Sequence, residues 1–206
     1  MEKIYFGGSF NPVCNHHINI ALLAARTFAK HIAFMPAYDA PHKNTLISFE
    51  HRLNMLKLAI DEYSNLSISL AEKEIHDKNK GEPSYSYNTF RHLAGINSNL
   101  TGVYSVSVLL GSDSVDDLLD KKWYMSDEIL ARIYNRTFKL YVPIRKGEKS
   151  KFLQDEKLCQ LVKVFNQDVG FDGSSSEFRE KYKNKEDVKD IINAKVLDYV
   201  VKNSLY

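Results

Sequence analysis

The stretch KIYFGGSFNPVCNHH, residues 3–17, decides the fold prediction. It opens with a short apolar and aromatic run that two adjacent glycines stop, which is typical of a buried strand. Glycines directly after a strand permit a tight turn and a close approach to an anion, at which the following helix directs its N–H groups. The stretch is neither a GxGxxG fingerprint nor a Walker loop. A plain strand–helix turn with two surface histidines therefore remains the alternative to an anion site.

Strand and helix patterns alternate along the rest of the chain. Apolar residues on one helical face predict helices over 15–30 and 49–63, and a third helix is predicted after Pro83, over 84–96. Short apolar or alternating runs predict further strands over 31–36, 66–70, 104–111 and 138–143. Strands that alternate with helices are typical of parallel βαβ units, so we predict an α/β fold with a parallel sheet.

The composition limits the class of protein. The 206 residues include only nine glycines, and the formal net charge of +2 provides no strong field for nucleic acid or an anionic membrane. No apolar run approaches the roughly 20 residues that span a bilayer, and the first residues lack the apolar region of a signal peptide. The two cysteines form no disulfide framework. We expect one cytoplasmic domain over 1–206, with 145–206 as its helical C-terminal part.

Three short segments follow predicted strands and are expected to meet at one edge of the sheet. They are residues 7–9, 36–43 and 111–113. In open parallel sheets, ligands bind outside the carboxyl ends of the strands, near the point where the strand order reverses. We therefore expect a binding site that is built from these segments.

Seven segments, taken in order, resemble one enzyme family. GGSFNPVCNHH (7–17) resembles the nucleotidyltransferase signature GxFxPxHxGH. The other six are PA with APHK (36–43), HRLNML (51–56), EPSYSYNT (82–89), LGSDS with Trp123 (110–123), SSSEFR (174–179) and LDYVVKNSLY (197–206). The chain thus resembles the bacterial-type nicotinate/nicotinamide mononucleotide adenylyltransferases. This resemblance implies a Rossmann-like parallel sheet with helices on both faces, of the nucleotidyltransferase type.

The resemblance implies a reaction of NAD biosynthesis between ATP and nicotinate mononucleotide, or its nicotinamide form. The 5′-phosphate attacks the α-phosphorus of ATP in line, pyrophosphate leaves, and no covalent enzyme intermediate forms. Mg²⁺ enters with the triphosphate and needs few protein ligands, and the histidines lack the spacing of a dedicated metal site. The bacterial-type spacing favours the acid as substrate. Neither nucleic acid nor a membrane is an expected partner, and the sequence predicts no oligomeric state.

The resemblance also implies roles for individual residues. His17 matches the second histidine of HxGH and is expected at the α-phosphate, while Lys43 and Arg179 are expected at the other phosphates. These three are the catalytic candidates. The ATP-binding candidates are Gly8, Ser9, Phe10, Cys14, His16, Gly111, Asp113 and Ser175. The mononucleotide-binding candidates are Tyr85, Ser86 and Trp123, whose indole is expected to stack on the pyridine ring.

Several of these residues also have an ordinary structural interpretation. Lys43 fits a solvated surface lysine, Asp113 fits a helix cap before Val115, and Trp123 fits core packing. SSSEFR (174–179) fits a capping box as well, from Ser174 to Glu177 or from Ser175 to Phe178, and the match to the family segment favours Ser175 as the cap of the helix that follows. Near the end of the chain a proline of the family pattern is absent, and Asn193 is expected to cap the last helix in its place.

Two positions depart from the family signature. Cys14 stands where HxGH has its first histidine, and a thiol is a weak donor without positive charge. His16 stands where the signature has glycine, and we hypothesise that His16 partly substitutes for the missing histidine. Two alternative functions stay open: another adenylyl- or cytidylyltransferase on the same scaffold, and a nucleotide-binding sensor that has lost turnover. The PHK segment, PSYSYNT and Trp123 argue against the first, and retention of His17, Lys43 and Arg179 argues against the second.

Overall fold

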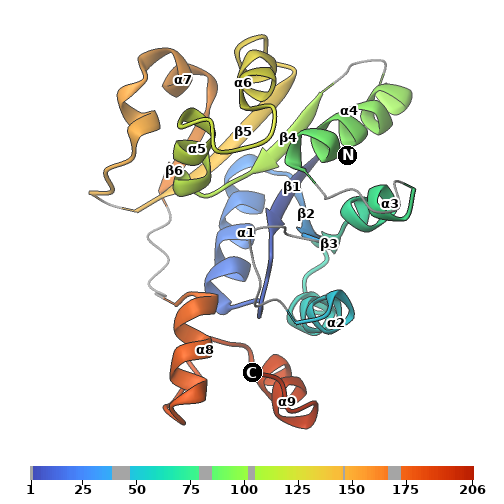
Figure 1. Ribbon diagram of the computed structural model, residues 1–206, viewed down its shortest axis with the longest axis vertical. Helices are drawn as coiled ribbons and strands as arrows, with labels where there is room; N and C mark the ends of the chain where they lie inside the picture. Colours follow the sequence, from blue (N-terminus) through green and yellow to red (C-terminus); the bar gives the residue numbers. More distant parts are fainter. Residues whose placement is uncertain (1, 39–46, 79–84, 102–104, 146, 167–172) are drawn as a thin grey trace.

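Strands and helices alternate along most of the computed structural model (Figure 1), which describes residues 2–38, 47–78, 85–101, 105–145, 147–166 and 173–206. The strands are β1 (Lys3–Gly8), β2 (His31–Pro36), β3 (Leu66–Ile68), β4 (Val106–Leu109), β5 (Phe138–Ile144) and β6 (Lys163–Asn166). The helices are α1 (Asn15–Phe28), α2 (Phe49–Ile60), α3 (Ala71–Lys78), α4 (Ser86–Thr101), α5 (Ser112–Leu119), α6 (Ser126–Tyr134), α7 (Glu156–Leu161), α8 (Ser175–Lys183) and α9 (Ala194–Lys202), with a short 3₁₀ helix η1 (Lys151–Gln154).

The described strands form one parallel sheet of six strands in the order β3-β2-β1-β4-β5-β6. Ile4 of β1 lies opposite Ile32 on one side and Ser107 on the other, so β1 and β4 are neighbours although four described helices, α1 to α4, separate them in the chain. The chain therefore reverses its direction of winding between β1 and β4, and the carboxyl ends of these strands mark the switch point where such sheets bind ligands. The prediction of a Rossmann-like parallel sheet is confirmed.

Helices cover both faces of the sheet because side chains of each strand alternate between the two. Ile4 and Phe6 face the core that contains α1, α2, α8 and α9, whereas Tyr5 faces the core that contains α4, α5, α6 and α7. Figure 1 shows α8 and α9 together at the lower end of the view, where α9 packs against α2. Among the described residues, no helix is long and apolar enough to cross a membrane.

Side-chain caps explain where several helices begin. The Ser48 hydroxyl accepts the His51 N–H at 3.3 Å before α2, and the Asn193 side chain accepts the Lys195 N–H at 2.8 Å before α9, as predicted for Asn193. Ser174 caps α8 by accepting the Glu177 N–H at 3.1 Å. The prediction that Ser175 is the cap is therefore wrong by one residue, which frees the Ser175 hydroxyl for a different partner.

The C-terminal part differs from the sequence prediction. Residues 145–206 are not only helical, because β6 lies within them and pairs with β5 from Tyr141↔Lys163 to Ile144↔Asn166. The segment KVFN has one buried side chain, Phe165, and exposed neighbours, so its pattern is too short and polar to indicate a strand. An edge strand of this kind depends on pairing with its neighbour rather than on its own hydrophobicity.

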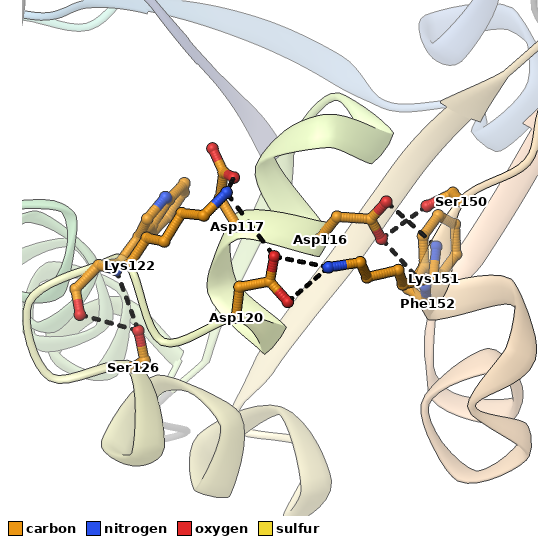
Figure 2. A network of polar contacts seen from close by, with 9 residues as sticks. Asp116, Asp117, Asp120, Lys122, Ser126, Ser150, Lys151 and Phe152 are labelled. Atoms are coloured by element: carbon orange, nitrogen blue, oxygen red, sulfur yellow. Dashed lines mark hydrogen bonds and ion pairs between the residues drawn. The ribbon is translucent and has the colours of Figure 1, made fainter.

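A network of polar contacts joins α5 to the segment that follows β5 (Figure 2). The Asp116 carboxylate accepts the Ser150 hydroxyl at 2.7 Å and the backbone N–H groups of Phe152 and Lys151 at 3.0 and 3.1 Å. Lys151 also pairs with Asp120 at 2.7 Å. Burial alone would raise the pKa of Asp116, but the hydrogen bonds from Ser150, Phe152 and Lys151 hold that pKa below its ordinary value. Asp116 thus fixes η1 against α5.

Candidate active site

A cavity of ≈ 1080 Å³ opens at the carboxyl ends of β1 and β4. It contains most of the residues that the sequence assigned to ATP, contributed by the β1–α1 turn (residues 9–14), the start of α5 and the start of α8. The predicted site residues that line it are Gly8, Ser9, Phe10, His16, His17, Gly111, Asp113, Ser175 and Arg179. Tertiary structure thus brings the two ends of the chain together at the switch point.

Gly8 and Phe10 shape one wall of the cavity. Phe10 adopts a left-handed backbone with φ 47° and buries its ring at 5.5 Å from Phe6 and 5.3 Å from Phe34. A Cβ on Gly8 would lie 2.8 Å from Phe10 Cζ, which is closer than real side chains approach. Glycine at position 8 is therefore required for the turn to fold back over β1.

Most of the carbonyl groups in and beside this turn accept hydrogen bonds from outside it. The Ala37 N–H binds the Gly8 carbonyl at 2.9 Å. The Ser175 hydroxyl donates to the Pro12 carbonyl at 2.9 Å, and Arg179 Nη1 donates to the Asn11 carbonyl at 2.6 Å. These donors fix the negative ends of the peptide groups, which favours a site for an anion in the same turn.

His17 is held as a neutral hydrogen-bond donor. The Cys14 N–H donates to His17 Nδ1 at 3.0 Å, so the ring proton resides on Nε2. Burial, and then the electrostatic interaction with His16, lower the pKa of His17 to about 4. The ring also packs edge-on to Phe10 with centroids 5.3 Å apart. His17 therefore offers an oriented N–H to an anion at neutral pH and carries no charge of its own.

Cys14 and His16 occupy different environments although both depart from the family signature. Cys14 is 1% exposed, its thiol faces the Pro12 carbonyl at 3.6 Å, and burial raises its pKa to about 12. It does not line the cavity. His16 does line it, with its ring 6.3 Å from the ring of His17. The side chain that faces the cavity beside His17 is thus His16, as the substitution hypothesis requires.

Arg179 and the N-terminus of α1 already have protein partners. Arg179 Nη2 donates to the Ser176 hydroxyl at 3.0 Å, so this bond and the one to the Asn11 carbonyl use two of its five N–H donors. The Asn15 N–H donates to the Ile191 carbonyl at 2.9 Å and therefore points at the protein. Side chains at the start of α1, rather than its first N–H, face the cavity.

The opposite wall of the cavity comes from β4, α5 and the segment after β5. Gly111 is the residue before α5, and a Cβ there would lie 2.5 Å from Asp113 Oδ1. Asp113 lies in the first turn of α5, which begins at Ser112, so its interpretation as a cap before Val115 is wrong. Glu148 accepts hydrogen bonds from the Ser112 hydroxyl and, at 2.7 Å, from the Arg145 N–H. No sequence pattern indicated Glu148.

The predicted mononucleotide residues lie outside this cavity. Tyr85 stacks on Tyr124 with ring centroids 4.5 Å apart, and Ser86 begins α4. Trp123 is half-buried and packs against the second core, and its backbone N–H donates to the Ser126 hydroxyl at 3.2 Å. Their assignment to the mononucleotide stays a prediction. Lys43 lies outside the described residues.

Arg52 is a buried charged residue beside the candidate site that the sequence analysis did not single out. It is 1% exposed and donates to three backbone carbonyls: Nη1 to Ser9 at 2.9 Å, Nε to Ile47 at 3.1 Å and Nη2 to Tyr38 at 3.2 Å. A buried arginine needs such acceptors, since its charge cannot be removed by deprotonation. The HRLNML segment was the available signal, because an arginine on an apolar helix face is unusual.

Comparisons with known proteins agree with this geometry. Residues 5–196 match the family model described as Cytidylyltransferase-like. Two curated relatives are each named "Probable nicotinate-nucleotide adenylyltransferase": one from Clostridium tetani is 33% identical and aligns over 100% of this chain and 98% of its own length. The other, from Endomicrobium trichonymphae, is 34% identical over 100% of both chains.

A solved structure supports the same fold assignment. It is titled "Plasmodium falciparum nicotinic acid mononucleotide adenylyltransferase complexed with NaAD" and aligns with a TM-score of 0.74 at 21% identity, covering 100% of this chain and 98% of that chain. The resemblance drawn from the seven sequence segments is confirmed. The chain belongs to the cytidylyltransferase-like family and, within it, to the nicotinate-nucleotide adenylyltransferases.

Proposed function

We propose that the protein transfers the adenylyl group of ATP to nicotinate mononucleotide and releases pyrophosphate. The observation that carries this proposal is the cavity at the β1/β4 switch point, which His17 and Arg179 both line although they are 162 positions apart in the sequence. Relatives at 33% and 34% identity over the full chain bear the corresponding name.

In this mechanism an oxygen of the mononucleotide 5′-phosphate attacks the α-phosphorus of ATP. The bond from that phosphorus to the β-phosphate oxygen breaks, and the electron pair leaves with pyrophosphate. The protein accelerates such a step by positioning and by stabilising charge. His17 Nε2–H donates to the α-phosphate, the backbone of Gly8 and Ser9 lies under the phosphates, and Arg179 binds the leaving pyrophosphate.

The remaining predicted residues have roles around this centre. Asp113 accepts the ribose hydroxyls of the adenosine beside Gly111. Tyr85, Ser86 and Trp123 bind the mononucleotide on the α4–α6 side of the sheet, and Lys43 adds a positive charge for phosphate. The acid is the proposed substrate because the relatives are named for nicotinate.

A divalent cation fits this site as part of the ATP complex. Within the described ranges, no group of three His, Cys, Asp or Glu residues is placed to hold a metal by itself. Asp113 and Glu148 are carboxylates that line the cavity, and Glu148 is already engaged by Ser112 and Arg145. Mg²⁺ held mainly by the triphosphate would neutralise phosphate charge there.

We propose a cytoplasmic enzyme, in keeping with its two free cysteines.

The test is pyrophosphate release from ATP and Mg²⁺ with nicotinate mononucleotide or nicotinamide mononucleotide. We expect pyrophosphate release when both substrates are present, and none when either ATP or the mononucleotide is omitted. We also expect a higher kcat/KM for nicotinate mononucleotide than for nicotinamide mononucleotide. A higher kcat/KM for the amide would contradict the substrate choice. ATP binding without pyrophosphate release from either mononucleotide would support the sensor, and turnover of a different phosphate would support another transferase.

A further inference from the structure

Asn11, in the β1–α1 turn, connects residue 206 to the cavity. Its side chain is 2% exposed, and its Oδ1 accepts the Tyr206 hydroxyl at 2.8 Å and the Ile47 N–H at 3.4 Å. Its backbone carbonyl accepts Arg179 Nη1 at 2.6 Å. One residue of the turn is thus bonded both to Tyr206 and to a cationic side chain that lines the cavity.

Tyr206 is held in place for this contact. Its ring packs edge-on to Phe178 of α8 with centroids 5.7 Å apart, and Phe178 is the chain neighbour of Arg179. Burial raises the pKa of the Tyr206 phenol, so its hydroxyl stays protonated and can donate. Tyr206 therefore holds the side chain of Asn11, while Arg179 of α8 holds the backbone carbonyl of the same residue.

We propose that Tyr206 is a positioning residue for adenylyl transfer, acting through Asn11 on the β1–α1 turn and on Arg179. Tyr206 does not line the cavity, so it touches no phosphate itself. The Tyr206 hydroxyl fixes the orientation of the Asn11 side-chain amide. With its side chain fixed, Asn11 keeps its backbone carbonyl aligned with Arg179. This proposal rests on the proposed function, because it assigns Tyr206 a part in that reaction.

The first test compares Tyr206→Phe with the matched variant Tyr199→Phe. Each change removes one hydroxyl and keeps the ring. The Tyr199 hydroxyl bonds to His51 Nδ1 at 3.0 Å and Asn54 Nδ2 at 3.1 Å, so it joins α9 to α2 and leaves the turn untouched. We expect Tyr206→Phe to lower kcat about three- to tenfold with Tm and the mononucleotide KM unchanged. Tyr199→Phe should keep the kcat of the unaltered protein.

The second test is a double-mutant cycle in kcat with Asn11→Ala. If Tyr206 acts through Asn11, Tyr206→Phe should have no further effect once Asn11 is alanine. Independent losses in the two variants would overturn the proposal. An unchanged kcat in Tyr206→Phe, or equal losses in Tyr206→Phe and Tyr199→Phe, would overturn it as well.

Calorimetric binding of Mg²⁺-ATP separates this proposal from the proposed function. An unaltered protein that turns over neither mononucleotide contradicts the proposed function. In that case the positioning role of Tyr206 is tested by the affinity for ATP, which should fall about threefold or more in Tyr206→Phe and should not fall in Tyr199→Phe. Equal ATP affinities in the two variants would overturn the positioning role.

Discussion

The two turns that face each other across the cavity are built in opposite ways. The β1–α1 turn has six residues, from Ser9 to Cys14, between a strand and a helix. The connection from β4 to α5 has two, and the helix begins at once: the Ser114 and Val115 N–H groups bond back to the Gly111 carbonyl at 3.1 and 3.2 Å. The second connection takes one bond from the sheet, from the Leu110 N–H to the Tyr141 carbonyl at 3.1 Å, and within the described residues it is otherwise organised by its neighbours in sequence.

The longer turn takes its shape from distant parts of the chain. Arg52, Ser175, Arg179 and Tyr206 bond to it across 43, 163, 168 and 195 positions of sequence. A six-residue segment without regular structure has many conformations of its own, and ordering each residue costs about 1–2 kcal/mol. Contacts from α2, α8 and residue 206 offset that cost, so the β1–α1 turn is the part of the candidate site that depends most on tertiary structure.

The largest expected effect comes from His17, in the first turn of α1 directly after the β1–α1 turn. His17→Ala removes the neutral N–H donor, and we expect kcat for pyrophosphate release to fall about 10²- to 10³-fold. His17→Asn should recover part of the loss, because its amide retains an N–H donor. A loss in His17→Ala no larger than that in His16→Gly would contradict the role of His17.

The pH profile adds a second check on His17. Its pKa is lowered to about 4, so the ring is neutral above that pH and protonated below it. The rate should therefore not change between pH 6 and 8 through titration of His17. It should fall towards pH 4, where protonation of Nδ1 breaks the bond from the Cys14 N–H.

His16 tests whether a neighbour compensates for Cys14. His16→Gly restores the glycine of the family signature and removes a side chain that lines the cavity. If His16 substitutes for the absent histidine, kcat should fall about tenfold, as expected for loss of one charge-assisted contact. Full activity of His16→Gly would end the hypothesis.

The two serines at the start of α8 separate helix capping from support of the turn. Ser175→Ala removes the bond to the Pro12 carbonyl, and we expect kcat to fall about fivefold with little change in Tm. Ser174→Ala removes the cap and should lower the free energy of unfolding by about 1 kcal/mol, with the smaller change in kcat. The reverse assignment of the two effects would contradict the division of roles.

The smallest effect on activity is expected on the β4–α5 side. Asp116→Asn should lower the free energy of unfolding by about 1–3 kcal/mol at pH 7, because the carboxylate accepts three hydrogen bonds. The folded-state pKa of Asp116 is lowered, so its stabilisation is present above the unfolded pKa of about 3.9 and is lost as pH falls below it. Denaturant unfolding of the unaltered protein and of Asp116→Asn, at pH 7 and at pH 3, measures the difference in free energy of unfolding and its loss at low pH.

Asp117→Asn is the matched control for that change. Asp117 pairs with Lys122 at 2.6 Å on the surface, as Figure 2 shows, and an exposed pair contributes about 0–1 kcal/mol. Equal destabilisation by Asp116→Asn and Asp117→Asn would show that the Asp116 hydrogen bonds add nothing.

Patterns in the sequence predicted the elements of the sheet where hydrophobic runs were strong. The predicted strands around β1, β2, β4 and β5 and the helices around α1, α2 and α4 are present, with ends shifted by a few residues. The predicted helix over 15–30 ends at Phe28, where Ala29 turns into a left-handed conformation with φ 50°. β6 was missed because its position depends on pairing with β5. α3 was missed because it carries few apolar residues, and α7 because its six residues are too few to show a helical period.

The site shows the same limit. Gly8, His17, Gly111 and Arg179 were found by resemblance, and the structure places all four on one cavity. Arg52 and Glu148 were missed because their partners are backbone groups and a serine hydroxyl far along the chain, which leave no local pattern. Cys14 matches an ATP-binding position in the motif. In the structure it is the residue before α1, and its buried thiol faces the Pro12 carbonyl instead of the cavity.

The sequence by itself determined the parallel α/β architecture, the glycine turn after β1 and membership in an adenylyltransferase family. Hydrophobic periodicity and motif order are local properties, so they can be read along the chain. Only the tertiary structure decided that His16 and not Cys14 faces the cavity, and that Arg52, Ser175, Arg179 and Tyr206 hold the turn in place. These contacts join residues far apart in sequence, and they form only when α2, α8 and residue 206 are brought against the β1–α1 turn.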